Sequence, residues 1–216
     1  NQQKARPTKD IDFLGTHINN DGEHIKSIFA QIAAVPCEED GILFDSDSIE
    51  VEDITQDKEY HGLRLTIMAS MDSVRQRISM DIGFGDVVTP GPQDLDYPLL
   101  LEDVPGVSIL AYSLETVVAE KFEAMITLSV NNSRMKDFFD VYTLLKADKV
   151  DNELLKEALV EVFANRGTQP DAEHVVFSDE FAQDEVRQKM WKSYLKKIKY
   201  KDELPFDEVM SVIKER

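Results

Sequence analysis

The chain has 216 residues, 42% hydrophobic and 31% charged, which suits one sizeable domain or a small domain with a helical appendage. Its formal net charge of -18 argues against a protein that coats nucleic acid, because phosphate contacts require clustered Lys and Arg. No window approaches about 18 consecutive apolar residues, and residues 1–10 lack the apolar stretch of a signal peptide. We therefore expect a cytoplasmic protein without membrane insertion.

The first half of the chain is predicted to contain four strands and one helix. β-Branched or aromatic residues at period two, bounded by Gly, Asp or Pro, are typical of strands and occupy residues 10–15, 41–51, 63–70 and 77–85. Apolar residues at helical spacing before Pro36 predict a helix over residues 23–35. This half is expected to be α/β or α+β.

The second half is predicted to be a helical lobe. Four prolines between residues 87 and 113 indicate a long ordered loop that crosses between two lobes, 1–112 and 113–216, which we expect to form one compact unit. A capping box at Ser113, with Thr116 or less regularly Glu115, starts a helix that ends near Asn131. Apolar residues at three and four spacing predict further helices over residues 134–146, 152–167, 179–198 and 205–216.

Two carboxylates in the first strand form a candidate metal site. Side chains alternate along a strand, so Asp10 and Asp12 share one face and Ile11 points to the other. Like charges so close repel one another, and a divalent cation between them removes that conflict. With one cysteine and four scattered histidines there is no zinc pattern, so the metal would be a hard cation such as Mg²⁺ or Mn²⁺. The alternative is a solvated acidic pair.

Asp81 is the third candidate metal ligand. It interrupts a strand whose other face carries Ile78, Met80, Ile82 and Phe84. An ionised carboxylate in such a strand is costly without a partner, and a shared metal would supply one. Three carboxylates from two strands suit phosphoryl or nucleotidyl transfer, in which one metal holds the triphosphate and another lowers the pKa of the attacking hydroxyl.

The helical lobe supplies candidate phosphate contacts. Lys121 lies in a mostly apolar helical stretch, from which its ammonium either reaches phosphate or extends to solvent. Arg134 precedes Asp137 by three residues, which is compatible with an intrahelical ion pair. In the sharper interpretation, Asp137 or Asp140 orients Lys121 or a base while Arg134 and Lys136 contact phosphates.

Four motifs, in order, resemble the AbiEii/AbiGii nucleotidyltransferase toxin family. They are RPTKDIDFLG, MDIGFGDVVTPGP, AYSLETVVAEKFEAM and NSRMKDFFDVY, and the likeness spans roughly residues 6–145. The resemblance implies a polymerase-β-like nucleotidyltransferase fold, a mixed sheet with flanking helices followed by a helical lobe. It also implies a toxin of a type IV toxin-antitoxin system.

The resemblance assigns roles to individual residues. It makes Asp10 and Asp12 the metal-binding pair and Asp81 the third carboxylate. Lys121 and Asp137 match the lysine and the aspartate of the later motifs. Thr8 matches the hydroxyl residue before the carboxylate pair, where a phosphate contact is expected.

Three functions stay open at this point. The leading one is transfer of a nucleotide from an NTP to tRNA, restrained by a cognate antitoxin. The second is transfer to a protein or a small molecule, which the acidic composition favours. The third is nucleotide or partner binding without catalysis, since the Gly-Gly or Gly-Ser turn that opens the family is not found in residues 1–9.

Overall fold

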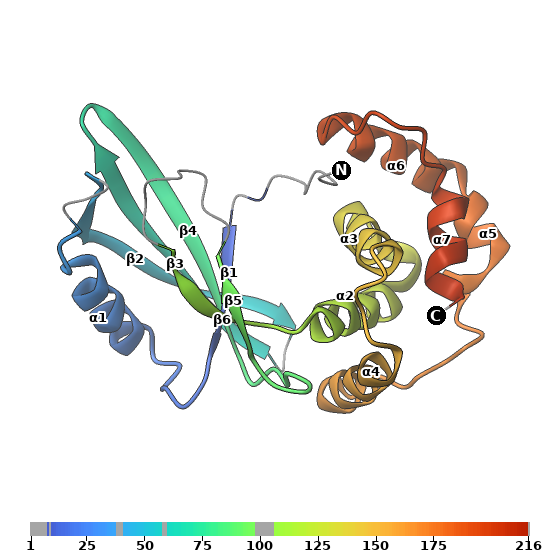
Figure 1. Cartoon of the computed structure of the whole chain (residues 1–216), viewed down its shortest axis with the longest axis horizontal. Helices are drawn as coiled ribbons and strands as arrows, with labels where there is room; N and C mark the ends of the chain where they lie inside the picture. The colour runs from blue at the N-terminus through green and yellow to red at the C-terminus, as the bar shows by residue number, and fades with distance from the viewer. Residues whose placement is uncertain (1–7, 9, 38–40, 58–59, 98–105, 216) are drawn as a thin grey trace. The chain divides into compact units, whose positions relative to one another are not determined.

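The computed structural model describes residues 8, 10–37, 41–57, 60–97 and 106–215. The chain divides into two compact units (Figure 1). The sheet unit comprises residues 1–86 and 98–106, and the helical unit comprises residues 87–97 and 107–216. The expected division at residue 112 falls inside the helical unit. The α+β architecture predicted from the sequence is confirmed.

The sheet unit contains a four-stranded mixed sheet and one helix. Its elements are β1 (Asp10–Gly15), α1 (Gly22–Ala33), β2 (Leu43–Asp57), β3 (Tyr60–Met71) and β4 (Val74–Phe84). The strand order is β1-β4-β3-β2, with β1 parallel to β4 and the other pairs antiparallel. Helix α1 contacts β2 (Figure 1). All four predicted strands are confirmed, and β2 and β3 are longer than expected.

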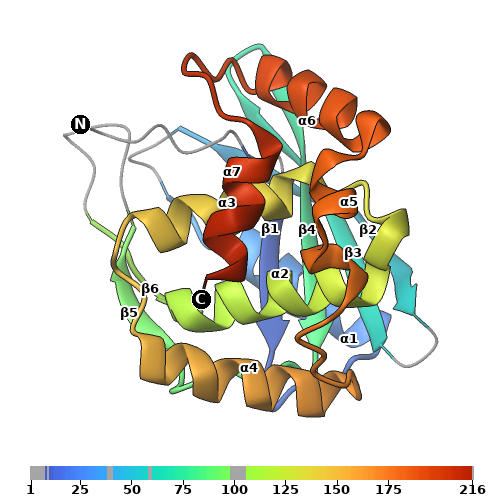
Figure 2. The same ribbon diagram turned by 90° about the vertical axis from the view of Figure 1, so that its right-hand side faces the viewer.

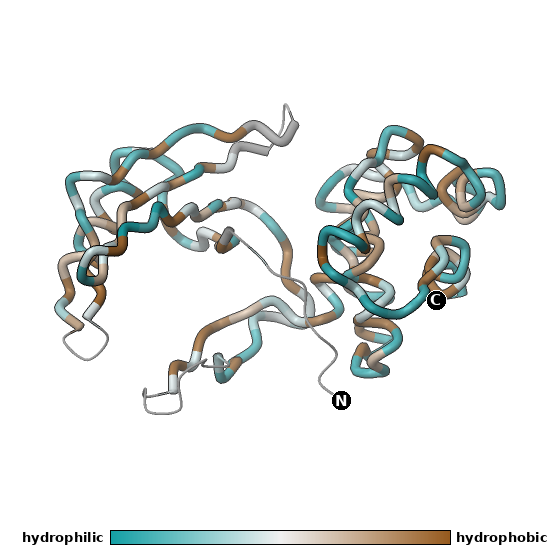
Figure 3. The backbone as a smooth tube through the Cα atoms, turned by 90° about the horizontal axis from the view of Figure 1, so that it is seen from above, coloured by the Kyte–Doolittle hydropathy of each residue, from teal (hydrophilic) through white to brown (hydrophobic). Residues whose placement is uncertain are grey.

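One face of this sheet is apolar and the other is polar. Leu63, Leu65 and Ile67 of β3 and Met80 and Ile82 of β4 are buried in one cluster, together with Ile25 of α1 and Ile49 of β2. Hydrophobic and hydrophilic residues alternate along the backbone of the strands (Figure 3). The alternation follows from the pleat, which sends successive side chains to opposite faces. Groups that bind a ligand are therefore expected on the polar face of the sheet.

A two-residue turn fixes the register of β3 against β4. Met71 pairs with Val74 across Asp72 and Ser73, and Asp72 adopts a positive φ of 50°. Because an antiparallel pairing continues in step from its turn, Arg64 is placed opposite Asp81. A shift by one residue would move Asp81 into the apolar face.

In the helical unit, two short strands precede a helix whose N-terminal cap is hydrogen-bonded to the segment before them. Strands β5 (Gln93–Asp96) and β6 (Ser108–Ala111) pair antiparallel. The Ser113 hydroxyl donates to the Thr89 carbonyl at 2.5 Å and accepts from the Thr116 amide at 3.1 Å. The prediction of a loop throughout residues 87–113 is therefore wrong for the two strands, whereas the Ser113 cap is confirmed.

Helices make up the rest of this unit. They are α2 (Leu114–Leu128), η1 (Ser129–Asn131), α3 (Met135–Lys146), α4 (Asn152–Arg166), η2 (Val175–Phe177), α5 (Asp179–Gln183), α6 (Glu185–Lys197) and α7 (Phe206–Lys214). Helix α2 runs between α3 and α4, and α7 contacts α3 (Figure 2). Trp191, Phe138 and Phe206 are buried at the centre of the core. No described helix is both long and apolar enough to cross a membrane.

The helix predicted over residues 179–198 is two helices. Asp184 leaves the helical conformation between α5 and α6, with a ψ of 123°, and its carboxylate accepts from the Arg187 amide at 2.8 Å. An Asp side chain competes in this way for backbone donors, which favours a helix start over a helix interior. The Arg187 guanidinium then stacks on Phe181 and donates to the carbonyls of Asn132 and Val130. Burial lowers the pKa of Arg187.

We expect Asp184→Ala to destabilise the helical unit by about 1 kcal/mol, because the first turn of α6 loses its capping carboxylate. Urea unfolding followed by circular dichroism measures the change. Glu185→Ala is the matched control, since Glu185 is exposed one residue later and caps nothing. Equal stability of the two variants would contradict the cap.

Candidate functional site

Two of the three predicted metal ligands lie side by side in the sheet unit. In the parallel pairing of β1 and β4, Asp12 is in register with Asp81, and Asp10 is in register with Ser79. Register partners on adjacent strands point to the same side of a sheet, so Asp12 and Asp81 share its polar face. Asp12 is exposed, and the Asp81 side chain is 17% exposed. The predicted orientation of Asp81, away from the apolar core, is confirmed.

Asp81 has a partner that the sequence did not reveal. Arg64 of β3 donates from Nε to Oδ1 and from Nη2 to Oδ2 of Asp81, both at 2.7 Å. This bidentate geometry is the strongest hydrogen-bonding arrangement between an arginine and a carboxylate. The partner that Asp81 was predicted to need is a guanidinium in this structure, and the shared metal stays a prediction.

The pair belongs to a row of charges that crosses all four strands. Glu52 of β2 is in register with Arg64, which faces Asp81, which faces Asp12. One positive charge thus lies within a row that holds three negative charges. Such a row attracts cations to the edge where Asp12 and Asp81 meet.

This edge suits a hard cation by the chemistry of its donors. Carboxylate oxygens are the ligands that Mg²⁺ and Mn²⁺ prefer. Among residues whose side chains the structure describes, no three His, Cys, Asp or Glu gather into a metal-binding group. The side chain of Asp10 lies outside that description, so the predicted triad stays a prediction. Thr8 is exposed just before β1.

In the helical unit, Lys121 of α2 lies between two carboxylates of α3. Its Nζ is 3.1 Å from Oδ1 of Asp137 and 2.9 Å from Oδ2 of Asp140. The Lys121 side chain is 20% exposed, and Asp137 is fully buried. Both aspartates therefore lie against Lys121, which is mostly buried rather than extended into solvent, and its role in contacting phosphate stays a prediction.

Arg134 approaches the same buried carboxylate from the start of α3. Its Nε is 2.7 Å from Oδ2 of Asp137, close enough for an ion pair although the hydrogen-bond geometry is poor. The intrahelical pair predicted from the spacing is therefore present as well. Arg134 remains 44% exposed, and the neighbouring Lys136 is exposed. Both have charge available at the surface of the unit.

Sequence reasoning missed Arg64, although a signal for it exists. The segment that contains Met71, Asp72, Ser73 and Val74 is a two-residue hairpin turn between alternating strands. Counting outward from that turn in both directions pairs Arg64 with Asp81. The alternation within β4 alone indicates that Asp81 needs a partner but does not name Arg64.

Comparison with known proteins identifies relatives of the chain. The family model described as nucleotidyl transferase AbiEii toxin, type IV TA system, matches residues 2–212. The crystal structure of JHP933 from Helicobacter pylori is similar over 92% of this chain and 80% of its own, with 16% identity and a TM-score of 0.42. An H. pylori protein described as a candidate nucleotidyltransferase is similar over 94% and 84%, with 14% identity and a TM-score of 0.32. No curated protein matched significantly. Because both TM-scores are below 0.5, the two structural likenesses support no conclusion about function, and the family match is the finding that does.

We expect Lys121→Met to lower the free energy of unfolding of the helical unit by about 2 kcal/mol, because the buried Asp137 carboxylate loses one of its two cationic neighbours. Lys136→Met is the matched control, since it removes the same charge from an exposed position of α3. Chemical denaturation of both variants tests the difference. A Lys121→Met protein as stable as the control would show that the ion pairs contribute nothing.

Proposed function

Since the chain belongs to the AbiEii family of nucleotidyltransferase toxins of type IV toxin-antitoxin systems, we propose that its acidic sheet edge binds Mg²⁺ or Mn²⁺ for transfer of a nucleotide from an NTP to tRNA. The observation that carries the proposal is the register pair of Asp12 and Asp81 on adjacent strands. Asp10, two residues before Asp12 on the same strand, completes the proposed ligand set. The family is NTP-dependent, so the reaction class follows from membership, whereas the metal and the acceptor are proposals.

The proposed reaction is a substitution at the α-phosphorus of the NTP. A hydroxyl oxygen of the acceptor forms a bond to this phosphorus, the bond from phosphorus to the oxygen that bridges to the β-phosphate breaks, and pyrophosphate leaves. The hydroxyl proton passes to a carboxylate or to water. A bound divalent metal supplies charge stabilisation to the phosphates and acidifies the hydroxyl. The task of Asp10, Asp12 and Asp81 is to hold that charge where the transition state develops.

In the helical unit, the proposed phosphate contacts are Lys121, Arg134 and Lys136. An ammonium has three N–H donors, and the contacts of Lys121 to Asp137 and Asp140 leave one for a phosphate oxygen. The two aspartates fix the direction of that donor before substrate arrives, which strengthens electrostatic catalysis. Thr8, exposed before β1, is proposed as a further phosphate contact.

The proposed acceptor is tRNA, in the cytoplasm, and the proposed partner is a cognate antitoxin protein. The support for RNA is a run of exposed lysines in the second half of α6 and just after it, comprising Lys192, Lys196, Lys197, Lys199 and Lys201. Such a run offers phosphate contacts on a protein that is otherwise strongly acidic. A protein or small-molecule acceptor is the second candidate, because the net charge of -18 disfavours broad contact with nucleic acid.

We expect Asp12→Asn to reduce nucleotide transfer by ~100-fold or more, because the variant loses a full charge at the metal. Its melting temperature should be unchanged or slightly raised, since the substitution removes repulsion between neighbouring carboxylates. Glu52→Gln is the matched control, because Glu52 is an exposed carboxylate on the far strand of the same charged row. Incorporation of labelled NTP gives the rate for each protein. Near-normal transfer by Asp12→Asn would exclude Asp12 as a ligand.

The acceptor is tested by incubating the protein with each labelled NTP, magnesium and total cell RNA and protein. We expect label in the tRNA band. Replacing Lys196 and Lys197 by Gln should reduce this labelling and flatten its dependence on salt, because fewer counterions are released on binding. Label confined to protein would favour the second acceptor class. Label in neither fraction would contradict transfer by this chain.

A further inference from the structure

The partner of Asp81 occupies the atoms that a metal would use. The Nε–H and Nη2–H donors of Arg64, here called the fork, each donate one hydrogen bond to an oxygen of the Asp81 carboxylate, both at 2.7 Å. Each carboxylate oxygen has two lone pairs, so these two hydrogen bonds use one acceptor position on each oxygen that would hold a metal. A guanidinium and a divalent cation at the same carboxylate also repel each other. Arg64 and a metal therefore compete for the Asp81 carboxylate.

We infer that Arg64 is a positioning residue that serves as the counter-ion of Asp81 while the metal is absent and is displaced from Asp81 when the metal binds. The inference rests on the proposed metal site. It assigns Arg64 a function in setting metal affinity. In the metal-free protein, the fork holds the Asp81 carboxylate in one orientation beside Asp12 and offsets the repulsion between the two. Metal binding at this edge then replaces the Arg64 guanidinium at Asp81 with the metal ion.

The accessibility of the pair makes that exchange feasible. The Arg64 side chain is 44% exposed, so a displaced guanidinium can be hydrated without crossing a packed core. Asp81 is 17% exposed and stays anchored on a strand with paired neighbours on both sides. Arginine is well suited to this role, because it is always charged and more weakly hydrated than lysine.

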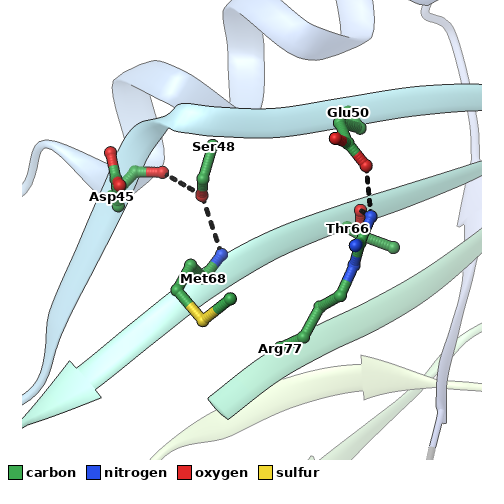
Figure 4. A network of polar contacts seen from close by, with 6 residues as sticks. All are labelled: Asp45, Ser48, Glu50, Thr66, Met68 and Arg77. Atoms are coloured by element: carbon green, nitrogen blue, oxygen red, sulfur yellow. Dashed lines mark hydrogen bonds and ion pairs between the residues drawn. The ribbon is translucent and has the colours of Figure 1, made fainter. Parts of the chain in front are cut away.

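A second arginine on the same face provides an internal comparison. Arg77 of β4 contacts Glu50 of β2 and donates to the Thr66 hydroxyl at 2.8 Å (Figure 4). Its partners lie on β2 and β3, away from the row that contains Asp81. Removing Arg77 therefore takes the same charge from the same face and leaves the Asp81 oxygens occupied. Arg77→Met therefore measures the effect of removing a positive charge from this face without freeing the Asp81 carboxylate.

The test measures binding of Mn²⁺ alone to the whole chain, by electron paramagnetic resonance of the free ion. We expect Arg64→Met to bind Mn²⁺ about five-fold more tightly than the wild type, the scale of a partly exposed ion pair. Arg77→Met should differ from the wild type by less than about two-fold, because screening weakens its effect at the Asp81 row. Arg64→Lys, which keeps the charge and loses the fork, should fall between Arg64→Met and the wild type.

Thermal melts supply a second readout. In EDTA, Arg64→Met should melt below the wild type, and saturating Mn²⁺ should raise its melting temperature by more than that of the wild type. If Arg64 had only a structural role, Arg64→Met would lower the melting temperature by the same amount in EDTA and in Mn²⁺. Should Arg64→Met fold poorly, Arg64→Lys carries the same comparison with a smaller expected effect.

The outcomes separate this inference from the proposed function. If Asp12→Asn weakens Mn²⁺ binding and neither Arg64 variant tightens it, the metal site stands and the role of Arg64 is overturned. If Asp12→Asn leaves Mn²⁺ binding unchanged, the metal site is wrong, and the inference about Arg64 falls with it. Weaker binding by Arg64→Met would mean that the fork assists the metal, which also overturns displacement.

Discussion

The register of β3 against β4 is the constraint on which the sheet unit depends. The two-residue turn at Asp72 and Ser73 sets it, and the pairs between β3 and β4 follow. The same register buries Leu63, Leu65 and Ile82 on one face and aligns Arg64 with Asp81 on the other. Because side chains alternate strictly between the two faces, the same register places the apolar residues in the core and Arg64 opposite Asp81 on the other face. A register slip that disrupted one would disrupt the other.

The two units resolve the conflict between like charges in different ways. In the sheet unit, Asp12 and Asp81 stay partly accessible, and water or an exchangeable cation can screen them. In the helical unit, Asp137 is fully buried, and Lys121 and Arg134 are held against it by packed helices. A buried carboxylate requires permanent partners, because an unpaired charge there would cost several kcal/mol. The first arrangement permits exchange, and the second provides rigidity.

The sequence predicted what depends on local pattern. Alternation placed Asp81 opposite the apolar residues of β4, and the three-residue spacing from Arg134 to Asp137 predicted their ion pair. What it did not decide depends on pairing between distant segments. Whether Lys121 meets solvent or a carboxylate is set by the packing of α2 against α3, and the Asp81 partner is set by a strand pairing. The break at Asp184 was missed for another reason, since apolar periodicity continues across it while the side chain caps a new helix.

This difference between the units determines what substitutions can reveal about function. A change at Asp12 removes an exposed charge, so a loss of activity there reports on chemistry with little contribution from folding. A change at Asp137 or Lys121 disturbs a buried network, so lost activity there combines chemistry with local unfolding. Residues of the helical unit therefore need stability measured beside rate, and coupling between Lys121 and Asp137 is best obtained from a double-mutant cycle. The proposed metal site is therefore tested most directly on the accessible row of the sheet, where effects on folding and on chemistry are separable.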